Sequence, residues 1–215
     1  MKGIGAGPPA RPGGHPLAAL RSLVPWWLRW YVVPRMARQV ATPEEARVAV
    51  DALAAMRPDV IKVVVDAVPL GGPILAPDVL RAIVAEARAR GLRTVAHIGT
   101  VADALEAADA GVAAWMHGVY KERIPDEVIP RLAAAGIPEV ATLTVFDSYA
   151  DLYEGRREAT ALERETVPAR ILDAFVPVPA NGRPAEFETF FALVAATRFL
   201  GGTELPRHPI RTDAS

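Results

Sequence analysis

The sequence contains no cysteine, which excludes a disulfide scaffold, a thiolate metal site and a cysteine nucleophile. A bound metal would therefore need histidine, carboxylate or modified lysine as ligands. The sequence also lacks an excess of charge of one sign. Its 215 residues have a formal net charge of −1, so electrostatics give no reason to expect nucleic acid or an anionic membrane as partner. With 51% hydrophobic residues, we expect a single globular domain over residues 1–215.

Long apolar runs are missing as well. The Gly/Pro-rich start has no apolar core of the kind found in a secretory signal, so we expect a cytoplasmic protein. The most apolar stretch, LVPWWLRWYVVP (23–34), is shorter than the roughly 20 apolar residues of a membrane span and is interrupted by Arg29. We expect an amphipathic helix packed on the domain. A surface patch facing a membrane or a partner remains an alternative, because Trp26, Trp27, Trp30 and Tyr31 crowd together.

From residue 42 the sequence alternates between helical and strand periodicity. Residues 1–41 are expected to form a Gly/Pro loop and the Trp-rich helix, 42–147 a β/α core, and 148–215 a helical segment with a weak last strand. The predicted helices span 42–56, 76–91, 100–111 and 124–136, and the predicted strands span 59–66, 93–98, 112–118 and 137–146. Residues 3–7 and 209–213 are weaker strand candidates. This alternation predicts an α/β fold with parallel strands, in a barrel or a doubly wound sheet.

No dinucleotide-binding fingerprint follows any predicted strand, so a Rossmann-type site is not expected. Three strands instead contain an unusual polar residue: Lys62, His97 and His117. Taken singly, Lys62 could form an ion pair with Asp66, and each histidine could be a hydrogen-bonded core residue. Three such residues on consecutive strands, at the face where parallel α/β proteins place their sites, favour a divalent metal such as Zn²⁺.

The stretches RPDVIKVVVD and LAPDVLRAIVAEARARGLRTVAHIGTVADALEAADAGVAAWMHG resemble the amidohydrolase superfamily, most closely its imidazolonepropionase-like branch. GPPARPGGHP and RQVATPEEARVAVDALAAM are similar to segments that precede this core, and the resemblance covers residues 5–147 well. It implies a (β/α)8 TIM-type barrel with one or two divalent metals. By this resemblance Lys62 is a carboxylated bridging ligand on the fourth strand, and His97 and His117 bind one metal.

The same resemblance implies further roles outside these three residues. Asp213 matches the eighth-strand aspartate loosely and would bind metal and relay a proton from the attacking water. Tyr120 would contact substrate, and His15 would either line the pocket or be structural. The first-strand HxH pair is absent, because the four histidines are His15, His97, His117 and His208, the last expected in an exposed loop. We therefore expect an incomplete barrel, roughly strands 3 to 8, that keeps one metal position.

Two functions follow from these patterns. The first is a metal-dependent hydrolase that cleaves a C–N bond in a small linear or cyclic amide with a metal-activated water. The second is an inactive, truncated barrel that acts as a binding or self-assembly module, with a homo-oligomer formed through the Trp-rich helix at 26–31. An unrelated α/β fold with fortuitous histidines is a third option.

Overall fold

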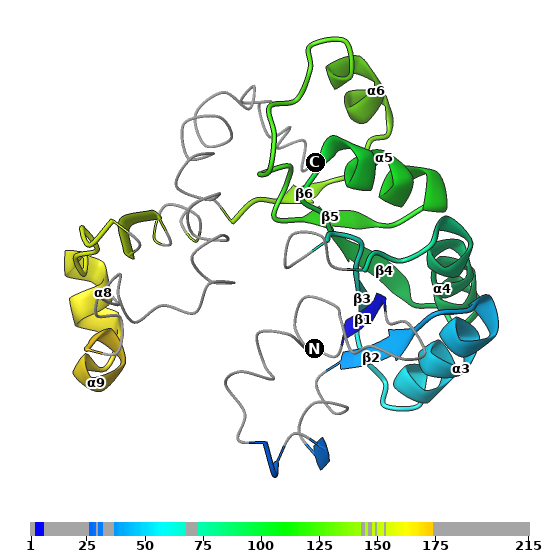
Figure 1. The fold of residues 1–215 in the computed structure, drawn as a ribbon, viewed down its shortest axis with the longest axis horizontal. Coiled ribbons are helices and arrows are strands. Elements are labelled where there is room, and N and C mark those ends of the chain that lie inside the picture. Colours follow the sequence, from blue (N-terminus) through cyan, green and yellow to red (C-terminus); the bar gives the residue numbers. More distant parts are fainter. Residues whose placement is uncertain are drawn as a thin grey trace, which may run out of the picture.

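The computed structural model describes residues 3–6, 26–28, 30–31, 37–67, 73–142, 145, 148, 150–152 and 154–173. Six parallel strands form one sheet in the order β2-β1-β3-β4-β5-β6 (Figure 1). The strands are β1 (Gly3–Ala6), β2 (Ala37–Val40), β3 (Val60–Val64), β4 (Arg93–His97), β5 (Ala114–Met116) and β6 (Glu139–Val140). The α/β class with a parallel sheet is therefore confirmed. Within the described residues the sheet is open, with β2 and β6 at its edges.

Helices connect the successive strands from β2 onward. They are α3 (Pro43–Ala54), α4 (Pro77–Ala89), α5 (Val101–Ala110) and α6 (Ile129–Ala134), with α8 (Ala161–Thr166) and α9 (Ala169–Leu172) later in the chain. The Thr42 side chain caps α3, as the sequence predicts, and Thr100 and Asp103 form a reciprocal capping box on α5. No helix among the described residues is long and apolar enough to cross a membrane.

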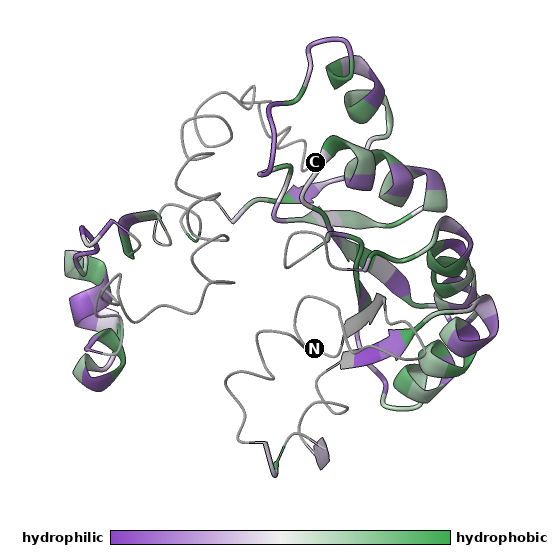
Figure 2. Cartoon of the chain, in the orientation of Figure 1, coloured by the Kyte–Doolittle hydropathy of each residue, from purple (hydrophilic) through white to green (hydrophobic). Residues whose placement is uncertain are grey.

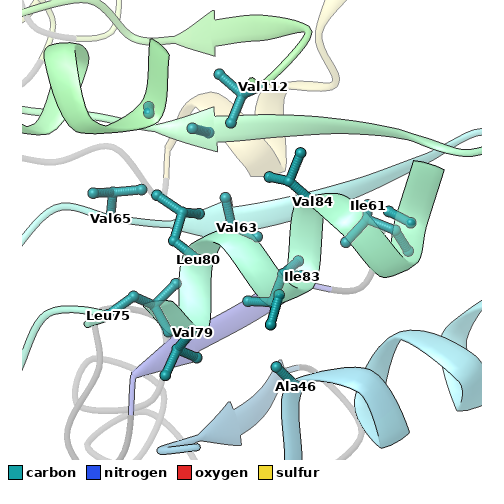
Figure 3. Packing of buried hydrophobic residues seen from close by; sticks show 14 of the residues in the cluster. Ala46, Ile61, Val63, Val65, Leu75, Val79, Leu80, Ile83, Val84 and Val112 are labelled. Atoms are coloured by element: carbon teal, nitrogen blue, oxygen red, sulfur yellow. The ribbon is translucent and has the colours of Figure 1, made fainter. Parts of the chain in front are cut away.

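Helices α3, α4 and α5 lie along the same face of the sheet (Figure 1), as in a barrel rather than a doubly wound sheet. Each has an apolar side and a polar side (Figure 2). Leu80 and Ile83 of α4 pack against Ile61 and Val63 of β3 in the buried core (Figure 3). Because alternate residues of a strand point to opposite faces, Lys62 lies on the sheet face turned away from these helices.

The structure differs from the sequence-based expectations at β2, β6 and α6. Strand β1 lies between β2 and β3, and β2 itself was not expected. Strand β6 has two residues rather than the ten predicted for 137–146, and α6 covers only part of 124–136. Residues 185–202 and 209–213, expected to form a helix and a last strand, lie outside the described residues.

The expected packing of the Trp-rich segment on the domain is wrong for the residues described there. Trp26, Trp27, Trp30 and Tyr31, here called the aromatic patch, are 80%, 59%, 75% and 45% exposed. Residues 26–28 form a turn and residues 30–31 are helical. The apolar side chains that would anchor an amphipathic helix therefore face solvent, which leaves the surface-patch alternative.

Candidate functional site

Polar side chains gather at the carboxyl ends of strands β3 to β6. His97 is the last residue of β4, Asp66 follows β3, and His117 follows β5. Thr142 comes two residues after β6. Since parallel strands end at the same edge of the sheet, these residues from four segments of the chain come within reach of one another.

Asp66 is the centre of this cluster. Its side chain is fully buried, and Oδ2 accepts a hydrogen bond of 2.6 Å from the Tyr120 hydroxyl. The ammonium group of Lys121 forms an ion pair with Oδ1 and donates to the carbonyl of Ala67 at 2.7 Å. Nε2 of His97 lies 3.3 Å from Oδ2. The carboxylate therefore joins β3, β4 and the segment after β5.

The electrostatics of the cluster favour an ionised Asp66. Burial by itself raises the pKa of this carboxyl, but the interactions with His97, Lys121 and Tyr120 outweigh burial and hold the pKa below its usual range. Burial raises the pKa of the Tyr120 phenol far above its ordinary value, and the adjacent Asp66 charge raises it further. Both shifts favour the hydrogen bond in which the protonated Tyr120 hydroxyl donates and the ionised Asp66 carboxylate accepts.

Gly99 allows this arrangement by leaving room for the carboxylate. A Cβ on Gly99 would lie 2.6 Å from Oδ2 of Asp66, closer than van der Waals contact permits. The Gly99 carbonyl accepts the backbone N–H groups of Tyr120 and Lys121 at 3.1 and 3.0 Å. These two backbone hydrogen bonds hold residues 120–121, both partners of Asp66, against the segment that follows β4.

The two predicted histidine ligands are brought together. The rings of His97 and His117 have centroids 4.4 Å apart, at an interplanar angle of 59°. His117 has a φ of +79°, a left-handed conformation in which non-glycine residues are uncommon but histidine is enriched, and Gly118 continues the turn with φ +71°. Nδ1 of His117 lies 2.8 Å from the Thr142 hydroxyl, which ties the ring to the segment after β6.

Lys62 lies on the same sheet face, further back along β3. Val64, two residues later, pairs with His97, so the Lys62 side chain begins one strand away from the histidine pair. Its side chain is half-buried, and burial lowers the pKa of its amine. Within the described residues no ion pair involves Lys62, and Asp66 contacts Lys121 instead. The alternative of a Lys62–Asp66 ion pair is therefore wrong.

The other predicted site residues stand as follows. Tyr120 joins the cluster through Asp66 and is 7% exposed, so its expected contact with substrate stays a prediction. His15 and Asp213 lie outside the described residues. Sequence reasoning missed the central role of Asp66 and the participation of Lys121 and Thr142. An acid directly after a buried strand was the available signal for Asp66, since such positions border the sites of parallel α/β folds.

The described side chains by themselves do not make a complete metal site. Among the described residues, no group of three or more His, Asp or Glu side chains could hold a metal ion. Two neighbouring imidazoles provide two nitrogen ligands, and two on one tetrahedral zinc, with Zn–N of about 2.1 Å, would have centroids roughly 5 Å apart. A lysine amine with a lowered pKa is able to take up CO₂ and supply anionic oxygen ligands. A third ligand from a modified Lys62 stays a prediction.

Several solved protein structures are similar to the fold of this chain. No protein-family model and no curated protein matches the sequence. Among solved structures, an amidohydrolase is similar at 28% identity with a TM-score of 0.54, over 77% of this chain and 34% of that one. An uncharacterized protein is similar at 25% identity with a TM-score of 0.53, over 77% and 35%. A prolidase complexed with N-methylphosphonate-L-proline shares the fold at 21% identity with a TM-score of 0.58, over 93% and 42%.

These similarities agree with the resemblance found in the sequence at the level of the superfamily. The chain spans about a third of the length of the first two structures. The imidazolonepropionase-like branch is not distinguished by these comparisons and stays a prediction. The fold of this chain is therefore similar to a segment of the fold that amidohydrolases share.

Proposed function

We propose that this chain forms part of a metal-dependent hydrolase site that cleaves a C–N bond of a small linear or cyclic amide. The observation that carries the proposal is the His97–His117 pair, whose rings lie 4.4 Å apart at the carboxyl ends of adjacent strands. Structural similarity to an amidohydrolase at 28% identity supports the reaction class. The incomplete (β/α)8 barrel, roughly strands 3 to 8, is part of the same proposal.

His97 and His117 would bind one divalent metal, most simply Zn²⁺, with Lys62 as a carbamate. The resemblance implies one or two divalent metals, and these three residues would supply ligands of one of them. When bound, the metal lowers the pKa of a water molecule and polarises the substrate carbonyl. The residues of the chain would orient this chemistry. Asp66 lies beside the His97 ring and Thr142 beside the His117 ring. Burial lowers the pKa of the Lys62 amine, which favours the neutral form that reacts with CO₂. Asp213 would relay the proton.

Metal binding by purified protein tests the ligand assignment. Zinc titration of the chelator-treated chain should give one site, and His97→Gln or His117→Gln should weaken it by more than about 100-fold, beyond the usual loss for an outer-shell partner. His208→Gln is the matched control, a histidine that the sequence places outside the site, and should bind zinc as the unmodified chain does. Unchanged zinc affinity in both site variants would contradict the proposal.

The carbamate can be tested separately because the chain has three lysines, Lys2, Lys62 and Lys121. After equilibration with ¹³C-bicarbonate and zinc, we expect one carbamate resonance by ¹³C NMR. It should be absent from Lys62→Met and present in Lys2→Met. Hydrolysis of a panel of N-acyl amino acids, dipeptides and cyclic amides should then depend on both zinc and bicarbonate.

The aromatic patch favours a second function, a self-assembly module. Three tryptophans and a tyrosine, all at least 45% exposed, make a surface of the kind that protein interfaces cover. Sedimentation velocity should show a dimer or higher oligomer that dissociates in the Trp26→Ser/Trp27→Ser/Trp30→Ser variant. A monomer at all concentrations in the unmodified chain would exclude this function.

A further inference from the structure

We propose that Gln39 is a substrate-binding residue, which donates a hydrogen bond from its side-chain amide to a second, uncharged carbonyl group of the substrate. The substrate class is then a small neutral amide with two carbonyl groups, held between Gln39 and the His97–His117 pair. This substrate class rests on the proposed function, whereas the position of Gln39 in the sheet does not.

Gln39 points to the sheet face that carries Lys62 and the two histidines. Gly3 of β1 pairs with Lys62, and paired residues of parallel strands lie on the same side of the sheet. Gly5, two residues later and hence on the same side as Gly3, pairs with Gln39. Val40, the next residue of β2, is buried in the core that α3 and α4 cover. Gln39 therefore faces away from the helices, toward the candidate site.

Gln39 is also level with His97 across the sheet. Continued by one residue, the register of β1 on β3 brings Gly5 level with Val64, which pairs with His97. Strands β2, β1, β3 and β4 are neighbours in this order (Figure 1), so about 14 Å separates Gln39 from His97 along the sheet. Gly5 contributes no side chain to this row and Val64 a short one. No long side chain of the row therefore stands between Gln39 and His97.

The side-chain amide nitrogen of Gln39 has no partner within the described residues. Its Nε2 atom is buried there and makes no hydrogen bond. Buried polar atoms in folded proteins almost always have a partner, so an exception calls for an explanation. The nitrogen of a carboxamide offers only N–H donors, so the missing partner is an acceptor. On the face that carries the candidate site, an oxygen atom of a bound ligand supplies that acceptor.

The charges around Gln39 favour an uncharged acceptor. Arg38, the preceding residue of β2, lies on the opposite face of the sheet, and Lys121 is paired with Asp66. Lys62 is a metal ligand in the proposed function. A substrate carboxylate at Gln39 would therefore lose its water without gaining a positive partner, which is costly. A neutral carbonyl accepts the same hydrogen bond without this cost.

The first measurement observes Gln39 directly in the metal-free full chain. Gln39 is the only glutamine of the sequence and Asn181 the only asparagine, so a ¹⁵N-labelled sample has two side-chain carboxamide signals. Selective labelling with side-chain ¹⁵N-glutamine identifies the Gln39 signal without a substitution. The probe is N-acetylglycine N,N-dimethylamide, an uncharged molecule with two carbonyl groups.

We expect the probe to shift the Gln39 signal with a saturable concentration dependence. The Asn181 signal in a uniformly labelled sample reports any non-specific effect of the added probe. A Gln39 signal that does not shift up to the solubility of the probe would overturn the inference.

A second, matched probe separates recognition of the second carbonyl from a structural role of Gln39. N-propylacetamide keeps the first carbonyl and lacks the second. By ligand-observed NMR, Gln39→Met should weaken binding of the two-carbonyl probe by about 3- to 10-fold and leave N-propylacetamide binding unchanged. Equal weakening of both probes would show a structural role and overturn the inference. Arg38→Met is the matched control on the opposite face of β2 and should leave both affinities unchanged.

A third probe tests the charge of the acceptor. N-acetylglycinate has a carboxylate in place of the second amide and should bind the unmodified chain at least about threefold more weakly than the two-carbonyl probe. Equal or tighter binding of the carboxylate would overturn the uncharged acceptor.

These outcomes are distinct from those of the proposed function. If the chain binds no zinc, the proposed function fails, while the Gln39 signal still decides whether Gln39 binds a neutral carbonyl. If zinc binds through the two histidines and the probe leaves Gln39 unaffected, the proposed function stands and the inference fails.

Discussion

Gly99→Ala tests whether the Asp66 cluster is as tightly packed as the structure shows. The φ of Gly99 is not in the left-handed region, so the backbone itself accepts alanine. On backbone grounds alone the substitution would stabilise the protein by about 0.4–1 kcal/mol, because it restricts the unfolded chain. The added Cβ, however, would meet three atoms of the Asp66 carboxyl group at 2.6–2.7 Å.

The steric effect should outweigh the gain from the unfolded chain. The carboxylate is not a freely moving side-chain end, since Tyr120 and Lys121 hold both of its oxygens. Overpacking of this kind costs about 1–3 kcal/mol, and displacement of Asp66 would weaken charged hydrogen bonds worth about 1.5–3 kcal/mol each. We therefore expect the steric effect of Gly99→Ala to lower the free energy of unfolding by about 2–4 kcal/mol. The backbone gain of about 0.4–1 kcal/mol offsets a small part of this loss.

Urea denaturation of a double-mutant cycle measures this effect directly. In the Asp66→Ala background the colliding carboxylate is gone, so Gly99→Ala should become neutral or slightly stabilising. A change of sign between the two backgrounds is the expected result. If Gly99→Ala destabilises equally in both, the cost arises elsewhere and the close approach of Asp66 to Gly99 is refuted.

Two further predictions concern α5 and the aromatic patch. Burial raises the pKa of Glu106, and repulsion from Asp103 raises it further. The folded state therefore holds the carboxyl proton more tightly than the unfolded state does. Stability should fall as the pH rises from the unfolded pKa of this group through its folded pKa. Glu106→Gln should therefore stabilise the protein at pH 7 by less than about 1 kcal/mol, and the gain should vanish below a pH of about 4; a gain equal at both pH values would contradict this. Of the four tryptophans, Trp115 is 7% exposed and the other three belong to the aromatic patch, so acrylamide should quench most of the fluorescence and leave a protected, blue-shifted component that Trp115→Phe removes. Strong protection of the three patch tryptophans would instead show that the patch is covered.

Much of the fold could be predicted from local sequence. Helices α3 and α5 begin at capping threonines whose side chains accept hydrogen bonds from their own first turns, and this interaction needs no distant partner. The β-branched run at 59–66 predicts a strand buried on both faces. Strand β3 is confirmed there, but Val60 and Lys62 are only half-buried. The pairing of His97 with His117 was also foreseeable, since parallel strands end at the same edge of a sheet.

The order of strands at the sheet edge could not be read from the sequence. Strand β1 lies between β2 and β3, although more than fifty residues separate it from β3 along the chain. The pairing of a short strand depends on which edge is open to it, and its own composition says little about this. The ten-residue strand predicted at 137–146 likewise reflects apolar composition, whereas β6 pairs with β5 over two residues.

The sequence by itself therefore determined the alternation of strands and helices and the position of polar residues at strand ends, because periodicity and capping depend on near neighbours. Only the tertiary structure decided which of those residues interact. Asp66 meets Tyr120 and Lys121 across 54 and 55 residues of sequence, in preference to Lys62 four residues away. Lys62 lies in β3 and Asp66 lies two residues after the end of that strand, but the partners of a buried carboxylate are those that the packing of other segments brings against it.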